Sequence, residues 1–175
     1  MSDDLHRHDR APAPGTVLPS HFPYCFGCGT DHASGLHLTI TAGAGLTMYG
    51  SFTVAEEHQG APGLVHGGVL AAAFDEVLGA SNWLLVTPAV TAHLEVDFRT
   101  PVPVGRTVQI EARIDSVDGR KVYTSGLGRF DDGTVVAHAE GLFIQVPLEH
   151  FAEHGRRRDV TELARELGSG LEINP

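Results

Sequence analysis

The sequence is poor in cysteine, in tryptophan and in positive charge. Its 175 residues include two cysteines and one tryptophan, and 12 Lys plus Arg stand against 22 Asp plus Glu, which leaves a net charge of −10. Two cysteines cannot build a disulfide scaffold, and a net negative charge repels phosphate backbones and anionic lipid. We therefore expect neither a disulfide-rich secreted domain nor a nucleic-acid partner.

Long apolar runs without charge are also missing. The most apolar stretch, Gly63 to Leu94, carries His66, Asp75, Glu76 and Asn82 among its side chains. A carboxylate at the centre of a bilayer costs about 2.5 to 3.5 kcal/mol, so this stretch predicts a buried helix rather than a membrane span. The first ten residues lack the apolar core of a secretory signal, and we expect a cytoplasmic protein without a membrane partner.

The composition is that of one folded domain. Hydrophobic residues make up 42% of the chain and charged residues 19%, which argues against disorder for most of it. Residues 1–20 are polar and proline-rich, which predicts a flexible N-terminal tail. We place the folded domain at residues 21–146, and a C-terminal helical extension or tail at residues 147–175.

Alternation of apolar and polar residues predicts six strands. Residues 36–41 and 46–54 alternate on either side of a Gly-rich turn and predict a hairpin. Four further strands are predicted at residues 91–99, 108–115, 121–130 and 134–146, arranged as a meander. The pairs Asp118-Gly119 and Asp132-Gly133 separate the last three of these strands, and Asp-Gly supplies the positive φ that tight hairpins need.

One long helix is predicted between the second and third strands. It runs from Gly68 to Leu85 and is stopped by Pro88; few of its positions are polar, so we expect the rest of the fold to enclose it. The chain is therefore predicted to be an α+β protein with a six-stranded antiparallel sheet wrapped around one long central helix. Two carboxylates, Asp75 and Glu76, stand near the middle of this helix, where burial would require a partner or a function. Glu76 points about 100° away from Asp75 on the helical wheel, toward a neighbouring chain or solvent.

Two adjacent glycines, Gly67 and Gly68, directly follow His66 at the start of the helix. The unpaired N–H groups and the dipole of a helix N-terminus can stabilise an oxyanion. Adjacent glycines can equally serve close packing of a helix on a strand. The presence of Asp75 nine residues after His66 favours the functional interpretation.

These residues resemble a known family. Val65-His66-Gly67-Gly68 followed by Asp75 resembles the HGG-to-Asp signature of hotdog-fold acyl-CoA thioesterases of the PaaI and 4-hydroxybenzoyl-CoA thioesterase-like type. The approach HQGAPGLVHGG is similar to the THEM4-like branch, and the segment from Thr91 to Pro103 resembles the strand that follows the helix in these proteins. The resemblance covers roughly residues 25–146, and the predicted order of strands and helix agrees with the hotdog fold.

The resemblance implies an enzyme that hydrolyses an acyl-CoA thioester to a free acid and CoA. It implies Asp75 as general base or nucleophile and the Gly67 N–H as the oxyanion donor. It further implies that His66 shapes the helix entry and that Thr91 helps to hold the attacking water. The candidate substrate contacts are Gly68, His58, Gly60, Trp83 and Arg99. No metal and no cofactor are expected besides CoA as part of the substrate.

Helix geometry adds an expectation about assembly. Gly67 and Asp75 are eight residues apart, so about 12 Å of helical rise separates them, too far for both to reach one carbonyl. If both act, two chains must share each site. The resemblance implies the same arrangement, a homodimer with sites at its interface or a tetramer of two such dimers.

Two alternatives concern the function of the fold. A hotdog module could bind acyl thioesters or fatty acids without turnover, because a fold alone does not fix an activity. Hydratases of the same fold pair the catalytic aspartate with a histidine five residues later. That position is Ala80 here, which disfavours hydration.

A further alternative concerns the CxxC pair, Cys25 and Cys28. Zinc needs four ligands, and His21, His32 or His37 could complete a site, although their spacing matches no familiar pattern. The surrounding segment, CFGCGTDHASGLHL, resembles a structural lead-in of many hotdog proteins, so we expect a structural role without metal. Basic side chains could contact the CoA phosphates, and the candidates besides Arg99 are Arg106, Arg120, Lys121 and Arg129.

Overall fold

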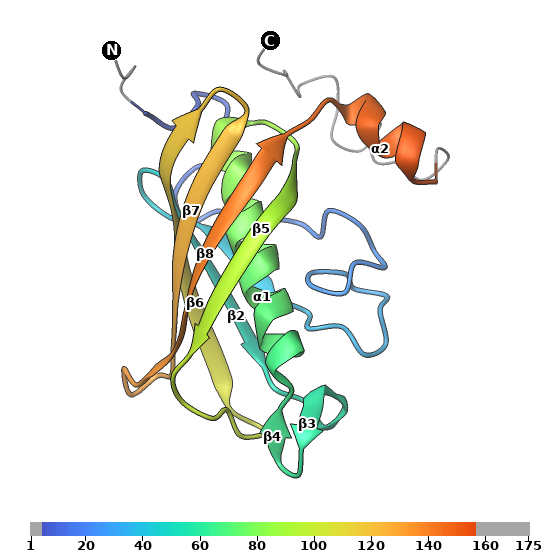
Figure 1. Ribbon diagram of the computed structural model, residues 1–175, viewed down its shortest axis with the longest axis vertical. Helices are drawn as coiled ribbons and strands as arrows, with labels where there is room; N and C mark the ends of the chain where they lie inside the picture. Colours follow the sequence, from blue (N-terminus) through green and yellow to red (C-terminus); the bar gives the residue numbers. More distant parts are fainter. Residues whose placement is uncertain (1–4, 157–175) are drawn as a thin grey trace.

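The computed structural model describes residues 5–156, in which an antiparallel sheet curves around helix α1, Gly67–Ala80 (Figure 1). The six strands are β1 (Thr39–Ala42), β2 (Thr47–Thr53), β5 (Ala89–Phe98), β6 (Thr107–Asp118), β7 (Lys121–Arg129) and β8 (Val135–Gln145). Their spatial order is β1-β2-β6-β7-β8-β5. The predicted α+β fold, with six antiparallel strands and one main helix, is confirmed.

The predicted meander of four strands is wrong in one respect. β5 pairs with β8 at the edge of the sheet, and β6 pairs with β2 in the middle. Alternation shows which face of a strand is buried but does not identify the neighbouring strand. The predicted β1–β2 hairpin is confirmed, as are the two Asp-Gly turns, where Gly119 has a φ of 56° and Gly133 a φ of 83°.

The first strand begins three residues later than predicted. His37 adopts a left-handed backbone with a φ of 48°, which interrupts the extended chain. The N–H groups of Leu36 and Leu38 donate to the carbonyls of Phe26 and Gly27 instead of to a neighbouring strand. Leu36 and Leu38 are nevertheless buried, so the apolar pattern predicted their burial correctly and only the start of the strand incorrectly.

Helix α1 is shorter than predicted and ends at Ala80. The chain continues as a 3₁₀ turn over Ser81–Leu85. The Ser81 hydroxyl donates to the Leu78 carbonyl, and the Asn82 amide donates to the Gly79 carbonyl at 3.0 Å. Side-chain donors thus satisfy carbonyls of the last helical turn, where the regular α-helical pattern stops.

Glycines in the sheet allow α1 to pack closely against it. Phe74 and Val77 are fully buried on the side of α1 that faces the sheet. A Cβ added at Gly50 would lie 2.3 Å from a Val77 methyl, and one added at Gly128 would lie 2.8 Å from the Phe74 ring. These two strand positions therefore accommodate Val77 and Phe74 because they carry no side chain of their own.

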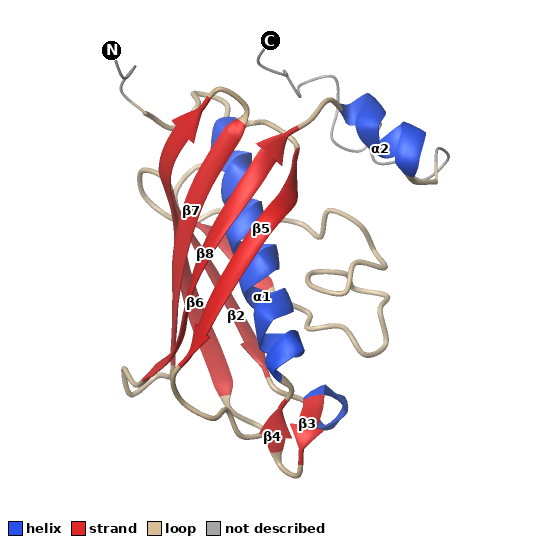
Figure 2. Cartoon of the chain, in the orientation of Figure 1, coloured by secondary structure: helices blue, strands red, loops and turns tan. Residues whose placement is uncertain are grey.

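A small hairpin precedes the helix start. A 3₁₀ turn over Glu56–His58 leads into β3 (Gln59–Ala61), which pairs with β4 (Leu64–Val65) (Figure 2).

After the sheet, α2 (Leu148–His154) buries none of its side chains. The remainder of the predicted C-terminal extension, residues 157–175, lies outside the described residues. Among the described helices, none combines the length and hydropathy needed to span a membrane.

The N-terminal segment is attached to the sheet, although we predicted a flexible tail. The Leu18 N–H donates to the Ile40 carbonyl at 2.8 Å, and the Ala42 N–H donates to the Thr16 carbonyl at 2.9 Å. This segment covers the outer edge of β1. At the opposite edge of the sheet, no strand within residues 5–156 pairs with the outer side of β5.

Candidate active site

Asp75 lies in the third turn of α1, beside the edge strand β5. The Thr91 hydroxyl, at the start of β5, donates a hydrogen bond of 2.7 Å to Oδ1 of Asp75. The fold therefore brings together two of the predicted catalytic residues, one from the helix and one from the sheet. Among the described residues no hydrogen bond to Oδ2 is recorded, so this oxygen is available to a water or a substrate.

Burial raises the pKa of the Asp75 carboxyl above its ordinary value. The hydrogen bond from Thr91 acts in the opposite direction because it stabilises the charged form, and the negative charges of Glu76 and Cys25 raise the pKa further. A carboxyl whose pKa is displaced upward is a stronger base when ionised. The position therefore suits general-base chemistry.

His66 caps the start of α1. Its Nδ1 accepts the Gly68 N–H at 2.9 Å, and its backbone carbonyl accepts from the N–H groups of Val69 and Leu70. Of the two glycine N–H groups at this helix start, only that of Gly67 has no recorded acceptor within the described residues. The predicted oxyanion donor is thus unpaired, whereas Gly68, a predicted substrate contact, already uses its N–H for the cap.

Two of the predicted substrate contacts instead support His66. A Cβ at Gly60 would lie 2.7 Å from the Cα of His66, so a glycine there permits β3 to approach the cap. His58 is 3% exposed, its Nδ1 accepts the Ala55 N–H at 3.0 Å, and its carbonyl accepts the His66 N–H at 2.8 Å. A buried His58 does not present its side chain to solvent, so the structure assigns it to the loop rather than to a substrate surface.

The far end of β5 lies against the helix start. Phe98 is 53% exposed, and its ring would be 3.5 Å from a Cβ at Gly67. Leu94 and Val96, which precede it at intervals of two along β5, pack on the core, whereas Phe98 at the strand end lies against the helix start. Sequence reasoning missed Phe98 as a neighbour of the predicted oxyanion donor, because contact between a strand end and a helix start leaves no local signal.

The remaining predicted contacts lie apart from one another. Trp83 is partly buried in the 3₁₀ turn after α1 and packs on the core. Arg99 directly follows Phe98, and its guanidinium pairs with Asp97 at 2.9 Å on an exposed surface. The structure therefore places Arg99, and not Trp83, beside the helix start.

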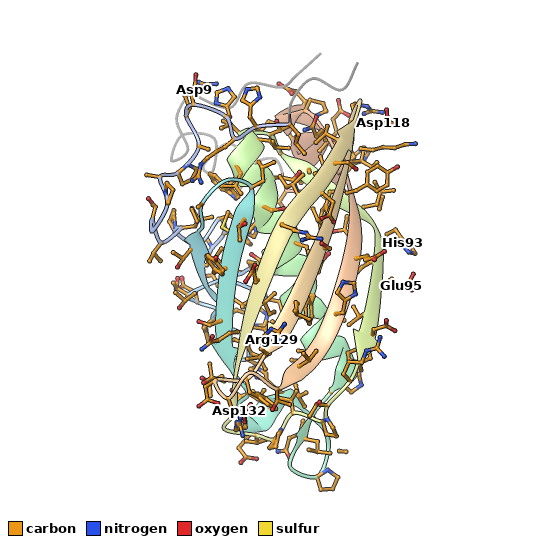
Figure 3. All side chains as sticks on the ribbon, turned by 90° about the vertical axis from the view of Figure 1, so that its left-hand side faces the viewer. Asp9, His93, Glu95, Asp118, Arg129 and Asp132 are labelled. Carbon is orange, nitrogen blue, oxygen red and sulfur yellow. The ribbon has the colours of Figure 1, made fainter. Side chains whose placement is uncertain are left out.

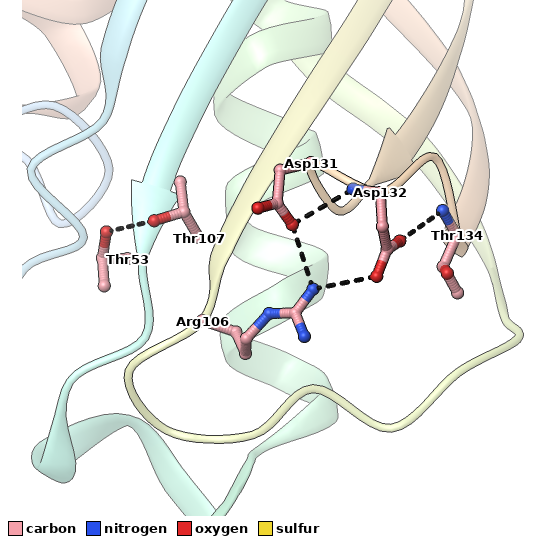
Figure 4. Close-up of polar contacts among 6 residues, drawn as sticks. All are labelled: Thr53, Arg106, Thr107, Asp131, Asp132 and Thr134. Atoms are coloured by element: carbon pink, nitrogen blue, oxygen red, sulfur yellow. Dashed lines mark hydrogen bonds and ion pairs between the residues drawn. The ribbon is translucent and has the colours of Figure 1, made fainter.

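Arg106 is occupied elsewhere. Its guanidinium pairs with Asp131 at 3.2 Å and with Asp132 at 3.4 Å, and it lies 4.1 Å above the Phe130 ring (Figure 4). These contacts fasten the β7–β8 turn to the start of β6. They leave Arg106 a weaker candidate for a CoA phosphate than Arg99.

A separate hollow lies on the sheet face opposite α1. It is lined by residues of β1, β2, β6, β7 and β8, among them Thr39, Tyr49, Glu111, Arg113 and Arg129. Figure 3 shows Arg129 on this face, whereas His93 and Glu95 project from β5. Of the predicted contacts the hollow contains Arg129, a candidate for the CoA phosphates, but none of the predicted catalytic residues, so it is not the site that Asp75 and Gly67 define.

A second polar cluster lies next to Asp75, on the other side of α1. Glu76 was predicted to face a neighbouring chain or solvent, but it contacts His21 at 3.3 Å and Cys25 at 3.3 Å. Cys28 also contacts His21, at 3.0 Å. Hydrogen bonds from Cys28 and His21 lower the pKa of the Cys25 thiol to about 3. The spacing of His21, Cys25 and Cys28 was visible in the sequence; the fourth member was not, because it comes from the helix.

The chain is similar to known thioesterases. The thioesterase superfamily model matches residues 62–137. Acyl-coenzyme A thioesterase THEM4 of Xenopus laevis is 37% identical over 89 residues, which is 50% of this chain and 40% of that protein. The chain therefore spans less than half the length of this relative.

Solved structures show the same fold. The crystal structure of a thioesterase superfamily protein has a TM-score of 0.66 and 31% identity, covering 78% of this chain and 70% of that chain. The PaaI protein of the E. coli phenylacetic acid degradation operon has a TM-score of 0.61 and 18% identity, covering 66% of this chain and 83% of that chain. The second likeness concerns the fold alone.

Proposed function

Because the chain belongs to the thioesterase superfamily, we propose that it hydrolyses an acyl-CoA thioester to a carboxylic acid and free CoA. The observation that carries the proposal is the hydrogen bond from Thr91 to Asp75, which stands on a helix whose first N–H, that of Gly67, has no acceptor among residues 5–156. The name of the THEM4 relative gives the substrate class. A thioester carbonyl is electrophilic, so one base and one oxyanion donor suffice without a nucleophilic cysteine or serine.

In the proposed reaction Asp75 acts as the general base. Its free Oδ2 takes a proton from a water molecule, whose oxygen then forms a bond to the thioester carbon. The carbonyl oxygen becomes an oxyanion that accepts the Gly67 N–H. When the tetrahedral intermediate collapses, the bond between carbon and sulfur breaks, and the CoA thiolate leaves and takes up a proton. The products are the acid and CoA.

The upward displacement of the Asp75 pKa and the role of Thr91 support this assignment. Thr91 occupies Oδ1 and so fixes the orientation of the carboxylate, leaving the other oxygen for water. A general base introduces the oxygen of water directly into the product. A single turnover in ¹⁸O-labelled water checks this step. A nucleophilic Asp75 would form a mixed anhydride, and attack of water on the Asp75 carbonyl of that anhydride would place the label in Asp75 and an unlabelled oxygen in the acid.

Each site is proposed to combine Asp75 of one protomer with Gly67 of another. Both residues lie on the same helix, with about 12 Å of rise between them. The outer edge of β5 supplies a surface for the second protomer, since no strand in the described part of the chain pairs with it and it carries exposed side chains such as His93 and Glu95. An open edge of ten residues is a surface on which another strand can pair. We therefore propose a homodimer formed along β5.

Arg99 is proposed as the contact for a CoA phosphate. It follows the last residue of β5 and lies next to Phe98, which covers Gly67. Its ion pair with Asp97 is exposed and therefore weak, so a phosphate can compete for the guanidinium.

The proposal is tested by assaying acyl-CoA substrates of different chain length, together with phenylacetyl-CoA and hydroxybenzoyl-CoA, with a reagent that detects the released thiol. We expect turnover of at least one substrate and a loss of roughly 100-fold or more in Asp75→Asn, with an unchanged circular dichroism spectrum. Thermal stabilisation by acyl-CoA without release of CoA from any substrate would contradict hydrolysis and indicate a binding module. Full activity of Asp75→Asn would remove Asp75 from the mechanism.

A further inference from the structure

Four potential metal ligands converge on the outer side of α1. The ligand atoms of His21, Cys25, Cys28 and Glu76 all lie within 4.8 Å of one another. Three come from one loop in the spacing H-x₃-C-x₂-C, and the fourth comes from the helix. The sequence alone could not pair the loop with Glu76.

The separations resemble the edges of a coordination tetrahedron. Zinc bonds of about 2.0 to 2.3 Å at tetrahedral angles place neighbouring ligand atoms about 3.3 to 3.8 Å apart. The recorded separations are 3.3 Å between Cys25 Sγ and Glu76 Oε2, 3.3 Å between His21 Nδ1 and Glu76 Oε1, and 3.0 Å between Cys28 Sγ and His21 Nδ1. The separations within the cluster extend to 4.8 Å at most, so adjustments of up to about 1 Å would bring these atoms around one ion.

The loop backbone presents the two cysteines on one side. The Gly29 N–H donates to the Cys25 carbonyl at 2.9 Å and closes the turn; a Cβ at Gly29 would lie 2.4 Å from that same carbonyl oxygen. Between the cysteines, a Cβ at Gly27 would lie 2.5 Å from Oε2 of Glu76. Both positions therefore require glycine if the cysteines are to face the glutamate.

The loop is fixed at its ends, where the Leu18 N–H bonds to β1 and Leu36 and Leu38 are buried, but it has no regular structure between them. Residues 18–38 contain no helix or strand, and the segment lies along α1 on the side away from the sheet (Figure 1). Loops of this length without regular structure are uncommon in compact domains, and metal ions are one means of fastening chain segments that lack a core of their own. A ligand from α1 would tie the loop to the central helix.

We propose that His21, Cys25, Cys28 and Glu76 bind one Zn²⁺ ion that fastens the 18–38 loop to α1. Two thiolates with an imidazole and a carboxylate in a tetrahedral arrangement favour zinc over the hard cations, which prefer oxygen ligands in larger numbers. Four protein ligands leave no open position for a substrate, so the ion is structural. The proposal departs from our expectation that the chain has no metal site, and it does not depend on thioester hydrolysis.

The test uses the tag-free full chain purified under reducing conditions with zinc in the medium. Elemental analysis after gel filtration should give roughly one zinc per chain. Replacement of zinc by Co²⁺ should produce the visible absorption of tetrahedral cobalt and a thiolate charge-transfer band. Both cysteines should be protected from a thiol reagent until a strong chelator is added.

Variants identify the ligands. We expect Cys25→Ser, Cys28→Ser and Glu76→Gln to retain less than about a tenth of the wild-type zinc. His32→Gln is the matched control, because it removes a histidine from the same loop outside the cluster; its zinc content should stay at the wild-type level. Glu76→Gln keeps the loop sequence intact and preserves the size of the side chain, so a folded Glu76→Gln protein without zinc separates loss of the metal from loss of the fold.

Three results would overturn the proposal. The first is reduced wild-type protein that contains less than about a tenth of a zinc ion per chain and takes up no cobalt. The second is a Cys25–Cys28 disulfide that persists in the reduced preparation. The third is full zinc content in Glu76→Gln together with loss of zinc in His32→Gln, which would assign the metal to a different set of ligands.

Discussion

The Thr91 hydroxyl donates a hydrogen bond of 2.7 Å to the Asp75 carboxylate across a sequence separation of 16 residues. This contact joins the third turn of the central helix to β5, an edge strand whose outer side pairs with no strand within residues 5–156. It fixes one carboxylate oxygen and leaves the other accessible. The geometry at this position therefore determines both the orientation and the basicity of the proposed base.

Thr91→Val should shift the pH dependence of hydrolysis. The hydrogen bond lowers the pKa of Asp75, so its removal should raise that pKa. The base works in its ionised form, and activity is lost as the pH falls through the pKa. The acid limb of the kcat/KM profile should therefore move to higher pH in Thr91→Val, by about one unit at most for a hydrogen bond to a charged group.

The control for this shift is Thr107→Val. Thr107, at the start of β6, pairs with Thr53, at the end of β2, at 2.8 Å (Figure 4). Strands β7 and β8 separate β6 from the edge strand β5, whose Thr91 contacts Asp75. Glu76 and Cys25, which also act on the Asp75 pKa, are the same in both variants. An acid limb that moves to lower pH in Thr91→Val, or by the same amount in both variants, would contradict the assignment.

The oxyanion donor can be removed without breaking the helix. Gly67 is the first helical residue, where proline is favoured because its missing N–H has no partner within the helix. His66, with φ of −70° and ψ of 134°, already has the extended backbone that a following proline requires. We expect Gly67→Pro to reduce kcat by roughly 100-fold or more, as measured with the preferred acyl-CoA.

Gly67→Ala is the matched variant that keeps the N–H. Its Cβ would contact the Phe98 ring at 3.5 Å, an ordinary van der Waals distance. Its kcat should therefore stay within about a factor of three of the wild-type value, since the donor is unchanged. Equal losses in the alanine and proline variants would show that shape at the helix start matters and the N–H does not.

The sequence predicted the elements of the fold better than their arrangement. Alternation identified six strands and the apolar stripe identified the helix, because both patterns reflect burial of one face. The place of β5 beside β8 could not be predicted, since pairing depends on the whole sheet. The attachment of Thr16 and Leu18 to β1 was also missed, because a proline-rich segment can bind an edge through its backbone alone.

The candidate site was predictable where residues form a local motif. His66, Gly67, Asp75 and Thr91 lie in recognisable segments, and the structure brings Thr91 to Asp75. The contact between Cys25 and Glu76 joins residues 51 positions apart and carries no periodic signal. The burial of His58 was likewise invisible, because a histidine that caps a turn and one that contacts a substrate have the same local sequence.

The close packing of α1 against β2 predicts that a methyl group added at Gly50 will destabilise the protein. A Cβ at Gly50 would lie 2.3 Å from a Val77 methyl in the middle of the core. Alanine restricts the unfolded chain and would by itself stabilise the protein slightly, but overpacking at this distance should outweigh that gain. We expect Gly50→Ala to lower the free energy of unfolding by about 1 to 3 kcal/mol in urea denaturation. Ser51→Ala, next along β2 on the opposite face, should change it by less than about 0.5 kcal/mol.

If two protomers share each active site, mixing two inactive variants should restore activity, which a site within one chain would not allow. Asp75→Asn and Gly67→Pro should each be inactive alone, but a mixed dimer combines the intact Gly67 of one protomer with the intact Asp75 of the other. Random exchange makes half of the dimers mixed, and one of the two sites in each is complete, so unfolding and refolding an equimolar mixture should restore about a quarter of the wild-type activity. The measurement is kcat per protomer, with each variant refolded alone as the control. If the mixture stays as inactive as the separate variants while size-exclusion chromatography shows mixed dimers, both residues must act within one chain or not at all.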